Sequence, residues 1–261
     1  MNISKSNPVE KVCRILLAIT DPASRRLTGI VDATGLNKVT VLRVLESLRR
    51  EGLIEKNEDT KTYHYGKELR LIASSLAEEE PLQTAARDSA RRLAEESGDV
   101  VTLFARSGWS SLCVDHAVGE HPRHRRTLSV GSRRPLGVGA GPTAILSWLD
   151  EEERHDAIAN IEPYLRPYRQ YYSVPAILES VSNTIDRGYC FSSNTLIKGA
   201  GAIGMPVLDP DRRVVGALCI SSDLERLGRE EERLATMLWQ ESMRIREKLS
   251  RVRPSRARST N

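Results

Sequence analysis

The sequence predicts an α+β protein of two domains, in which a small helical unit ending in a hairpin precedes a larger unit of helices and antiparallel strands. Three observations support this prediction. The 261 residues are enough for one large domain or two smaller ones. Three short N-terminal segments repeat apolar residues at helical spacing. From residue 99 onward, strand-like segments are interspersed with amphipathic helical segments.

Residues 1–66 are predicted to form the first domain, which starts with three short helices. The first helix ends at an Asp-Pro pair, which breaks the helical pattern. The second begins at Thr28, a good N-cap, and ends at Gly35, whose permissive backbone allows a sharp turn. Asn37 is predicted to cap the third helix, which ends at Gly52.

A β-hairpin with an exposed basic tip at residues 57–61 is predicted after the third helix. Two short helices joined by a tight turn and followed by a hairpin are typical of a winged helix-turn-helix, which places a helix in the major groove of DNA. Residues 1–66 carry 11 Lys and Arg against 8 Asp and Glu, a balance compatible with DNA binding. The residues predicted to contact double-stranded DNA are Thr28, Asn37, Lys38, Thr40, Val41, Arg43, Lys61 and His64. The alternative is a solvated helix face on an ordinary three-helix domain.

The N-terminal DNA-binding domain of the IclR family of bacterial transcription regulators resembles residues 27–66, LTGIVDATGLNKVTVLRVLESLRREGLIEKNEDTKTYHYG. The matching residues are Thr28, Ile30, Ala33, Thr34, Gly35, Leu36, Lys38, Thr40, Val41, Arg43, Leu45, Leu48, Gly52 and Leu53. Gly29 departs from the acidic residue usual in the family, and Val31 departs from the usual alanine. The resemblance implies operator binding as a homodimer or a dimer of dimers.

Residues 67–80 are predicted to form a linker helix, residues 81–250 the second domain, and residues 251–261 a basic disordered tail. The expected elements of the second domain are a helix at 82–98, strands at 99–106 and 110–118, a short strand at 128–130, helices within 141–149, 151–161 and 172–190, a hairpin within 196–221 and a closing helix at 227–251. Helices that flank an antiparallel sheet make an α+β domain.

Three segments, VGSRRPLGVGAG, DRGYCFS and GAIGMPVLDPDRRVVGALCIS, resemble the effector-binding domain of the same family, which has a GAF/profilin-like fold. This resemblance implies a cup for a small-molecule effector, lined by Val138, Gly139, Ala140, Gly141, Ser192, Ser193, Ala202, Cys219 and Ser221. A helix N-terminus at the glycine-rich loop would favour an anion, so a small organic acid is the expected ligand. Ser192 and Ala202 depart from the acidic and polar residues usual in the family, so the effector's identity does not transfer.

A G-x-G-x-x-G motif at Gly199, Gly201 and Gly204 raises the alternative of a dinucleotide site. Such a site needs a helix directly after the glycines, because the pyrophosphate rests on the helix N-terminus. The residues that follow instead predict strand, turn and strand. We therefore expect the glycines to allow close backbone approach and to form one low wall of the effector cup.

Metal binding and catalysis have little support in the sequence. Cys113, His116, His121 and His124 offer zinc-type ligands, but their spacing matches no structural zinc pattern, and ordinary surface histidines are expected. Neither a G-x-S-x-G elbow nor an H-E-x-x-H motif occurs. No catalytic residue, metal ligand or cofactor is predicted. One alternative is an enzyme whose C-terminal domain is catalytic, with an accessory DNA-binding domain. Another is a second domain that only oligomerises.

The remaining features indicate a cytoplasmic protein without a membrane segment. No run approaches the roughly 18 apolar residues that span a bilayer. The N-terminus lacks the apolar region of a signal peptide, and the four scattered cysteines are expected to be reduced thiols. Together with the resemblance, the sequence predicts a ligand-responsive transcriptional regulator.

Overall fold

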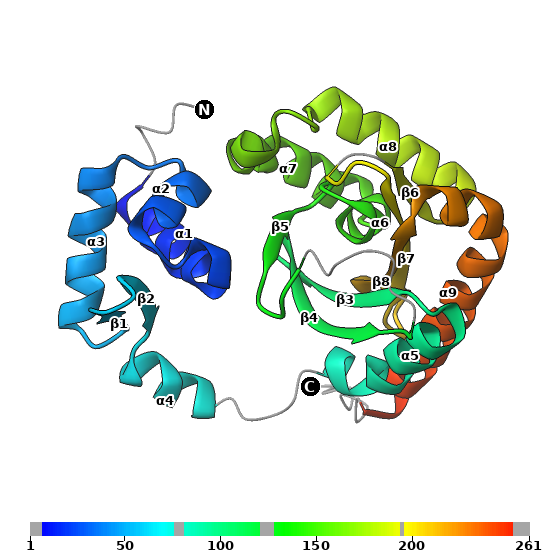
Figure 1. Cartoon of the computed structure of the whole chain (residues 1–261), viewed down its shortest axis with the longest axis horizontal. Helices are drawn as coiled ribbons and strands as arrows, with labels where there is room; N and C mark the ends of the chain where they lie inside the picture. Colours follow the sequence, from blue (N-terminus) through cyan, green and yellow to red (C-terminus); the bar gives the residue numbers. More distant parts are fainter. Residues whose placement is uncertain (1–6, 76–80, 121–127, 194–195, 253–261) are drawn as a thin grey trace, which may run out of the picture.

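The computed structural model describes residues 7–75, 81–120, 128–193 and 196–252. Figure 1 shows a small N-terminal unit in blue beside a larger unit that contains a curved sheet. The N-terminal unit contains α1 (Pro8–Thr20), the 3-10 turn η2 (Pro22–Ser24), α2 (Leu27–Thr34), α3 (Lys38–Arg50), β1 (Ile54–Asn57), β2 (Thr62–Tyr65) and α4 (Lys67–Ser75). This order confirms the predicted helices and hairpin.

Two caps fix the turn between α2 and α3. Gly35 ends α2 with a left-handed backbone, at φ 67°, which favours glycine. The side-chain oxygen of Asn37 accepts a hydrogen bond of 2.8 Å from the amide of Thr40, as an N-cap should. Both helices then bury their apolar faces against α1, where Ile15, Ile30 and further apolar side chains are fully buried.

The predicted start of α2 at Thr28 is wrong, because the helix begins at Leu27 with Arg26 at the N-cap position. Arg26 makes no side-chain capping bond, and its backbone instead bridges to Thr62 in the hairpin. The amide of Tyr63 also donates to the carbonyl of Arg25. The chain is thus tied to the hairpin just before the helix begins.

The larger unit is built on a six-stranded antiparallel sheet in the order β5-β4-β3-β8-β7-β6. Its strands are β3 (Val100–Ser107), β4 (Ser110–Val118), β5 (Arg133–Pro135), β6 (Cys190–Ser193), β7 (Ala200–Leu208) and β8 (Val214–Asp223). Its helical segments are α5 (Pro81–Ser97), α6 (Ala140–Ser147), α7 (Glu151–Ile161), η3 (Glu162–Tyr168), α8 (Val174–Arg187) and α9 (Leu224–Val252). Helices α5 and α9 cover one face of the sheet, and α6 and α8 cover the other (Figure 1).

The strand predicted at residues 128–130 is wrong, since the edge strand β5 forms at Arg133–Pro135 instead. The segment before it turns back on itself: Gly131 has φ 92°, and the Ser132 amide donates to the Ser129 carbonyl. Pairing with β4, rather than local apolar alternation, therefore determines where the strand lies. Within the described residues, no helix is long and apolar enough to cross a membrane.

The hairpin predicted from the glycine motif is confirmed, because β7 and β8 pair antiparallel from Ala200 to Leu208. A Cβ atom built on Gly204 would lie 2.4 Å from the carbonyl oxygen of Ala140, at the start of α6. Real Cβ atoms do not approach backbone so closely, so any side chain here would push α6 off the sheet. Because residue 204 is glycine, the first residues of α6 can pack directly against β7.

Gly204→Ala is therefore expected to destabilise the protein by about 1–3 kcal/mol through overpacking, measured by urea denaturation. Gly228→Ala is the matched control, because a Cβ there meets nothing within 4 Å and the residue lies in α9. That control should raise stability by up to about 1 kcal/mol through helix propensity. Equal effects of the two substitutions would contradict the packing explanation.

Candidate DNA-binding surface and effector cup

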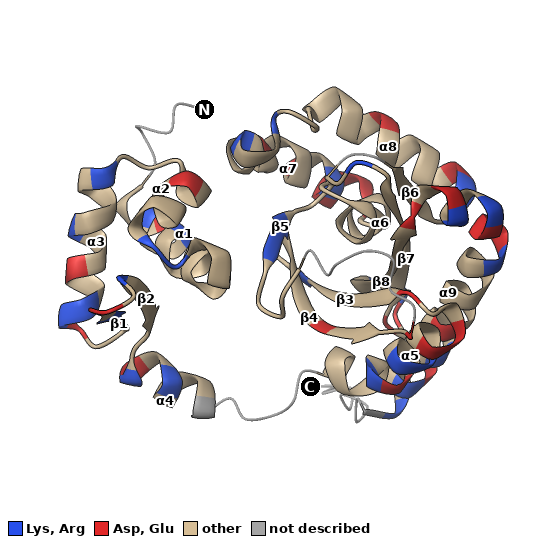
Figure 2. Cartoon of the chain, viewed as in Figure 1, with Lys and Arg blue, Asp and Glu red and all other residues tan. Residues whose placement is uncertain are grey.

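The outer side of α3 carries three of the eight residues predicted to contact DNA. Lys38 and Arg43 are exposed, and Thr40 is half-buried near the start of the helix. Thr28 is exposed in the first turn of α2. The structure brings these residues onto the helix-turn-helix, and blue segments of the α3 ribbon in Figure 2 mark its Lys and Arg positions.

Val41 does not belong to this surface, which corrects the prediction. Its side chain is 0% exposed and packs in the core of the N-terminal unit. Helical periodicity explains the difference, because Val41 lies on the same inward face as Leu45 and Leu48. Asn37 is exposed, but its side chain is engaged in capping α3.

Two apolar residues on the outer side of α3 escaped prediction. Val39 is 68% exposed and Leu42 is 41% exposed. Apolar side chains on a recognition helix can contact the methyl group of thymine in the major groove. The sequence could have indicated them, because their spacing places both residues away from the inward face of α3 that Val41, Leu45 and Leu48 form. An apolar side chain at such a position cannot pack into the core of the unit.

The hairpin tip is not the uncompensated basic surface expected from the sequence. Glu58 accepts from Lys56 at 2.8 Å and from Lys61 at 3.3 Å. These hydrogen bonds lower the pKa of Glu58 and, on the other side of the pair, raise the pKa of Lys56. The ring of His64 forms a hydrogen bond with the Thr62 hydroxyl at 2.8 Å. A phosphate group would therefore compete with Glu58 for the lysines.

In the larger unit, a cavity of about 90 Å³ opens between the sheet and the start of α6. Seven of the predicted cup residues line it, namely Gly139, Ala140, Gly141, Ser192, Ala202, Cys219 and Ser221. The other two predictions are wrong. Val138 is 0% exposed and packs in the core beneath α6, and Ser193 lies outside the lining. Ser193 follows Ser192 along β6, and neighbouring strand residues point to opposite faces.

The pairing of β3, β7 and β8 determines which side chains form the floor of the cup, that is, the part of its lining that the sheet provides. Cys219 on β8 is paired with Thr102 on β3, and Ser221 is paired with Val100 on β3 and Ala202 on β7. Paired residues in neighbouring strands point to the same face, so these side chains form one row. Thr102 and Val100 were not predicted, because pairing between distant strands cannot be obtained from local periodicity. Burial raises the pKa of Cys219 to about 12, so its thiol is protonated at neutral pH.

The N-terminus of α6 and the edge strand β5 also contribute to the lining of the cup. Gly139 occupies the N-cap position at φ 95° and makes no side-chain capping bond. The Nη1 atom of Arg134 would lie 3.1 Å from a Cβ atom built on Gly139. Arg134 was missed by the sequence analysis, although it lies within the glycine-rich segment that resembles the family. Its positive charge was the one feature of the sequence that could have indicated a role in anion binding, because strand β5 was not predicted.

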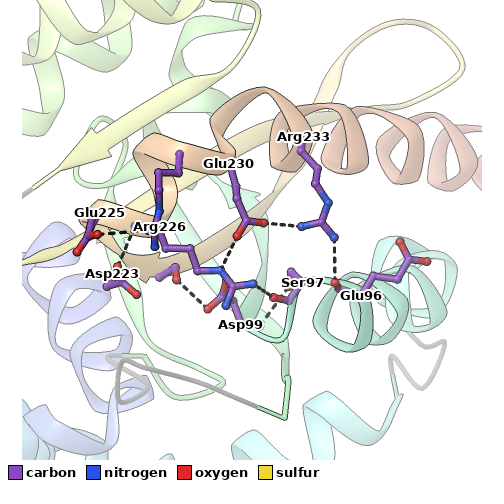
Figure 3. A network of polar contacts seen from close by, with 10 residues as sticks. Glu96, Ser97, Asp99, Asp223, Glu225, Arg226, Glu230 and Arg233 are labelled. Carbon is purple, nitrogen blue, oxygen red and sulfur yellow. Dashed lines mark hydrogen bonds and ion pairs between the residues drawn. The ribbon is translucent and has the colours of Figure 1, made fainter.

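Behind the floor, a polar network joins β8 to α9 and the end of α5 (Figure 3). Ser222, which also borders the cup, donates a 2.8 Å hydrogen bond to Asp99, whose side chain is fully buried. Arg226 lies 3.6 Å from the other carboxylate oxygen of Asp99 and 3.2 Å from Glu230, and it donates to the carbonyl of Ser97. This network fixes the end of β8 against the helix layer.

The zinc hypothesis gains no support from the residues that the structure describes. They contain no group of three or more potential metal ligands. Cys113 is buried in the sheet. His121 and His124 lie outside the described residues.

Comparison with known proteins matches both units to one family. Residues 8–58 match the model of the IclR helix-turn-helix domain, and residues 74–246 match that of the bacterial transcriptional regulator IclR C-terminal domain. The chain is 25% identical to the HTH-type transcriptional regulator KipR of Bacillus subtilis, covering 84% of this chain and 86% of KipR. It is 29% identical to the glycerol operon regulatory protein of Streptomyces coelicolor, over 79% of this chain and 80% of that protein.

Solved structures show the same fold. An IclR transcriptional regulator from Silicibacter aligns with a TM-score of 0.70 at 19% identity, over 95% of this chain and 98% of the other. An IclR homologue from Microbacterium hydrocarbonoxydans, complexed with 4-hydroxybenzoate, aligns with a TM-score of 0.64 at 17% identity, over 94% of this chain and 100% of the other.

The buried Asp99 generates a prediction about pH. Burial raises its pKa, against the opposing effects of the Ser222 hydrogen bond and the Arg226 charge. The protonated Asp99 carboxyl therefore contributes fully to the stability of the fold below about pH 3.9, the pKa of an aspartate in an unfolded chain. This contribution is lost as the pH rises towards the higher pKa that Asp99 has in the folded protein. The side chain of Asn in Asp99→Asn still offers an oxygen that can accept the Ser222 hydrogen bond, but it does not ionise. The variant should therefore become more stable than the wild type as the pH rises. Urea unfolding across pH measures this, and parallel profiles of the two proteins would contradict it.

Proposed function

Because the chain belongs to the IclR family of bacterial transcriptional regulators, we propose that its winged domain binds operator DNA as a homodimer and that a small organic acid in the cup modulates this binding. The family consists of transcriptional regulators with a helix-turn-helix and an effector-binding domain, not of enzymes. We further propose that the protein acts in the cytoplasm, either as a dimer or as a dimer of dimers. A two-fold protein suits operators built from paired half-sites.

The exposed side of α3 supports the proposal for DNA. Lys38, Thr40 and Arg43 offer hydrogen-bond donors to base edges and phosphates, and Val39 and Leu42 add apolar contacts between them. Thr28 at the start of α2 and Lys61 and His64 on the hairpin would contact the flanking backbone. Asn37 would act indirectly, by holding the first turn of α3.

The cavity itself is the observation that carries the proposal for the effector. A domain that served only to oligomerise would need no cavity between α6 and the sheet, whereas here one of about 90 Å³ opens there. Its wall combines the helix start with the hydroxyl groups of Ser192 and Ser221, and its described lining contains no carboxylate. These features suit a small anion. Ligand binding would then shift the population between states with different DNA affinity.

Arg43→Ala is expected to weaken specific operator binding by about 1–3 kcal/mol while leaving the fold intact, because an exposed arginine on α3 contacts bases or phosphates. Fluorescence anisotropy with an operator duplex and a scrambled duplex measures this. Arg91→Ala on α5 is the matched control, since its side chain is 68% exposed in the other unit. An Arg43→Ala protein with wild-type operator affinity would contradict the proposed placement of α3.

Glu58→Gln is expected to strengthen DNA binding several-fold at low salt, because it releases Lys56 and Lys61 to bind phosphates. The slope of log affinity against log salt concentration should become steeper, by about one unit for each additional phosphate that the variant neutralises. The measurement is a salt titration of both proteins on one duplex. Weaker binding by the variant, or an identical slope, would show that the hairpin tip does not approach DNA.

A further inference from the structure

Arg134 lies between two cavities. It lines the effector cup, and it also lines a cleft of about 280 Å³ between the two units, whose opposite wall belongs to α1 and α2. Among the described residues, it alone lines both. Its backbone is fixed within the sheet by pairing with Ser111, whose hydroxyl donates to the Arg134 carbonyl at 3.3 Å. The backbone of Arg134 is therefore held at the boundary between cup and cleft.

The guanidinium group of Arg134 brings a positive charge to the cup. Its Nη1 atom approaches Gly139 at the start of α6, and its charge favours the thiolate form of Cys219, against the burial that raises the pKa of Cys219 to about 12. No carboxylate in the described part of the chain forms an ion pair with Arg134, and none lines the cup there. A guanidinium group binds carboxylates through two parallel hydrogen bonds.

On the other side, Arg134 faces the DNA-binding unit. Asp21, at the end of α1, lines the same cleft. Tyr168 lines this cleft too, and burial raises the pKa of its hydroxyl, on which the charges of Arg134 and Asp21 act in opposite directions. The two units also touch here, because the Arg14 guanidinium group lies 5.0 Å from the centre of the Tyr164 ring.

We propose that Arg134 binds the anionic group of the effector and, through the same guanidinium group, conveys occupancy of the cup to the DNA-binding unit. A carboxylate in the cup neutralises the guanidinium charge beside the cleft that Asp21 also lines, and this changes the electrostatic interaction between the two units. This inference rests on the proposed function, and it adds the residue that selects the ligand and the route of coupling.

Arg133 provides a matched control on the same strand. Its Nη1 atom donates to the Ser107 hydroxyl at 2.9 Å, and it lines the cleft but not the cup. Arg133→Gln therefore removes one positive charge from β5 and leaves the cup unchanged. Arg134→Gln removes the charge from the cup itself, and Arg134→Met, apolar and of similar reach, is a second variant should the first not fold.

The experiment uses the full chain and three pairs of probes, each a carboxylate with its neutral amide: pyruvate and pyruvamide, benzoate and benzamide, 4-hydroxybenzoate and 4-hydroxybenzamide. Thermal shift measures binding, and anisotropy measures operator affinity with each probe. In the wild type, at least one carboxylate should raise the melting temperature and change operator affinity, whereas its amide should do neither. Arg134→Gln should weaken binding of that carboxylate on the order of ten- to hundredfold and abolish its effect on DNA. Arg133→Gln should keep the carboxylate preference.

The possible failures are distinguishable. If the wild type responds to a carboxylate and the Arg134 variants respond equally, the inference is wrong and the proposed function stands. If an amide acts as strongly as its carboxylate, Arg134 does not select the ligand and the inference is again wrong. If no probe affects the wild type, both the inference and the proposed organic-acid effector are contradicted.

Discussion

The structure of the larger unit depends on the close approach of the start of α6 to the sheet. Gly204 on β7 leaves room for the Ala140 carbonyl, and Gly141 leaves room for the ring of Phe104, since a Cβ atom built on Gly141 would lie 2.4 Å from that ring. These contacts place the N-terminus of α6 directly over the central strands. The cup is the space that remains between the helix start and the small side chains of β7 and β8. A larger residue at either glycine would displace the helix and with it the wall of the cup.

The same sheet connects the cup to its surroundings on both sides. Below the floor, Asp99 accepts a hydrogen bond from Ser222 on β8 and lies beside Arg226 in α9. These contacts hold the last residues of β8 against α9. On the other side, β5 carries Arg134, which lines both the cup and the cleft that faces α1 and α2. Among the described residues, Arg134 is the one charged side chain that a ligand in the cup would meet. Differential interaction with that side chain is what a ligand needs to shift a conformational equilibrium.

Local chemistry made much of this predictable. Caps at Gly35 and Asn37 identified the helix-turn-helix, and the strand–turn–strand pattern after the glycine motif correctly replaced a nucleotide loop with a hairpin. Pairing between strands that are distant in the sequence determined the features that could not be predicted. The three residues of β5 carry no alternation, so neither the strand nor the position of Arg134 could be derived locally. Val41 shows the opposite case: helical periodicity places it on the inward face of α3 with Leu45 and Leu48, and its assignment to DNA contact was wrong.

Hydrogen exchange of the full chain, with and without a carboxylate that binds it, tests the central claim most directly. If occupancy of the cup is conveyed through β5 to the DNA-binding unit, the amides at the start of α6 and in β5 should gain protection, and the exchange of α1 and α2 should change as well. Protection confined to α6 and the sheet, with α1 and α2 unaffected, would contradict the account.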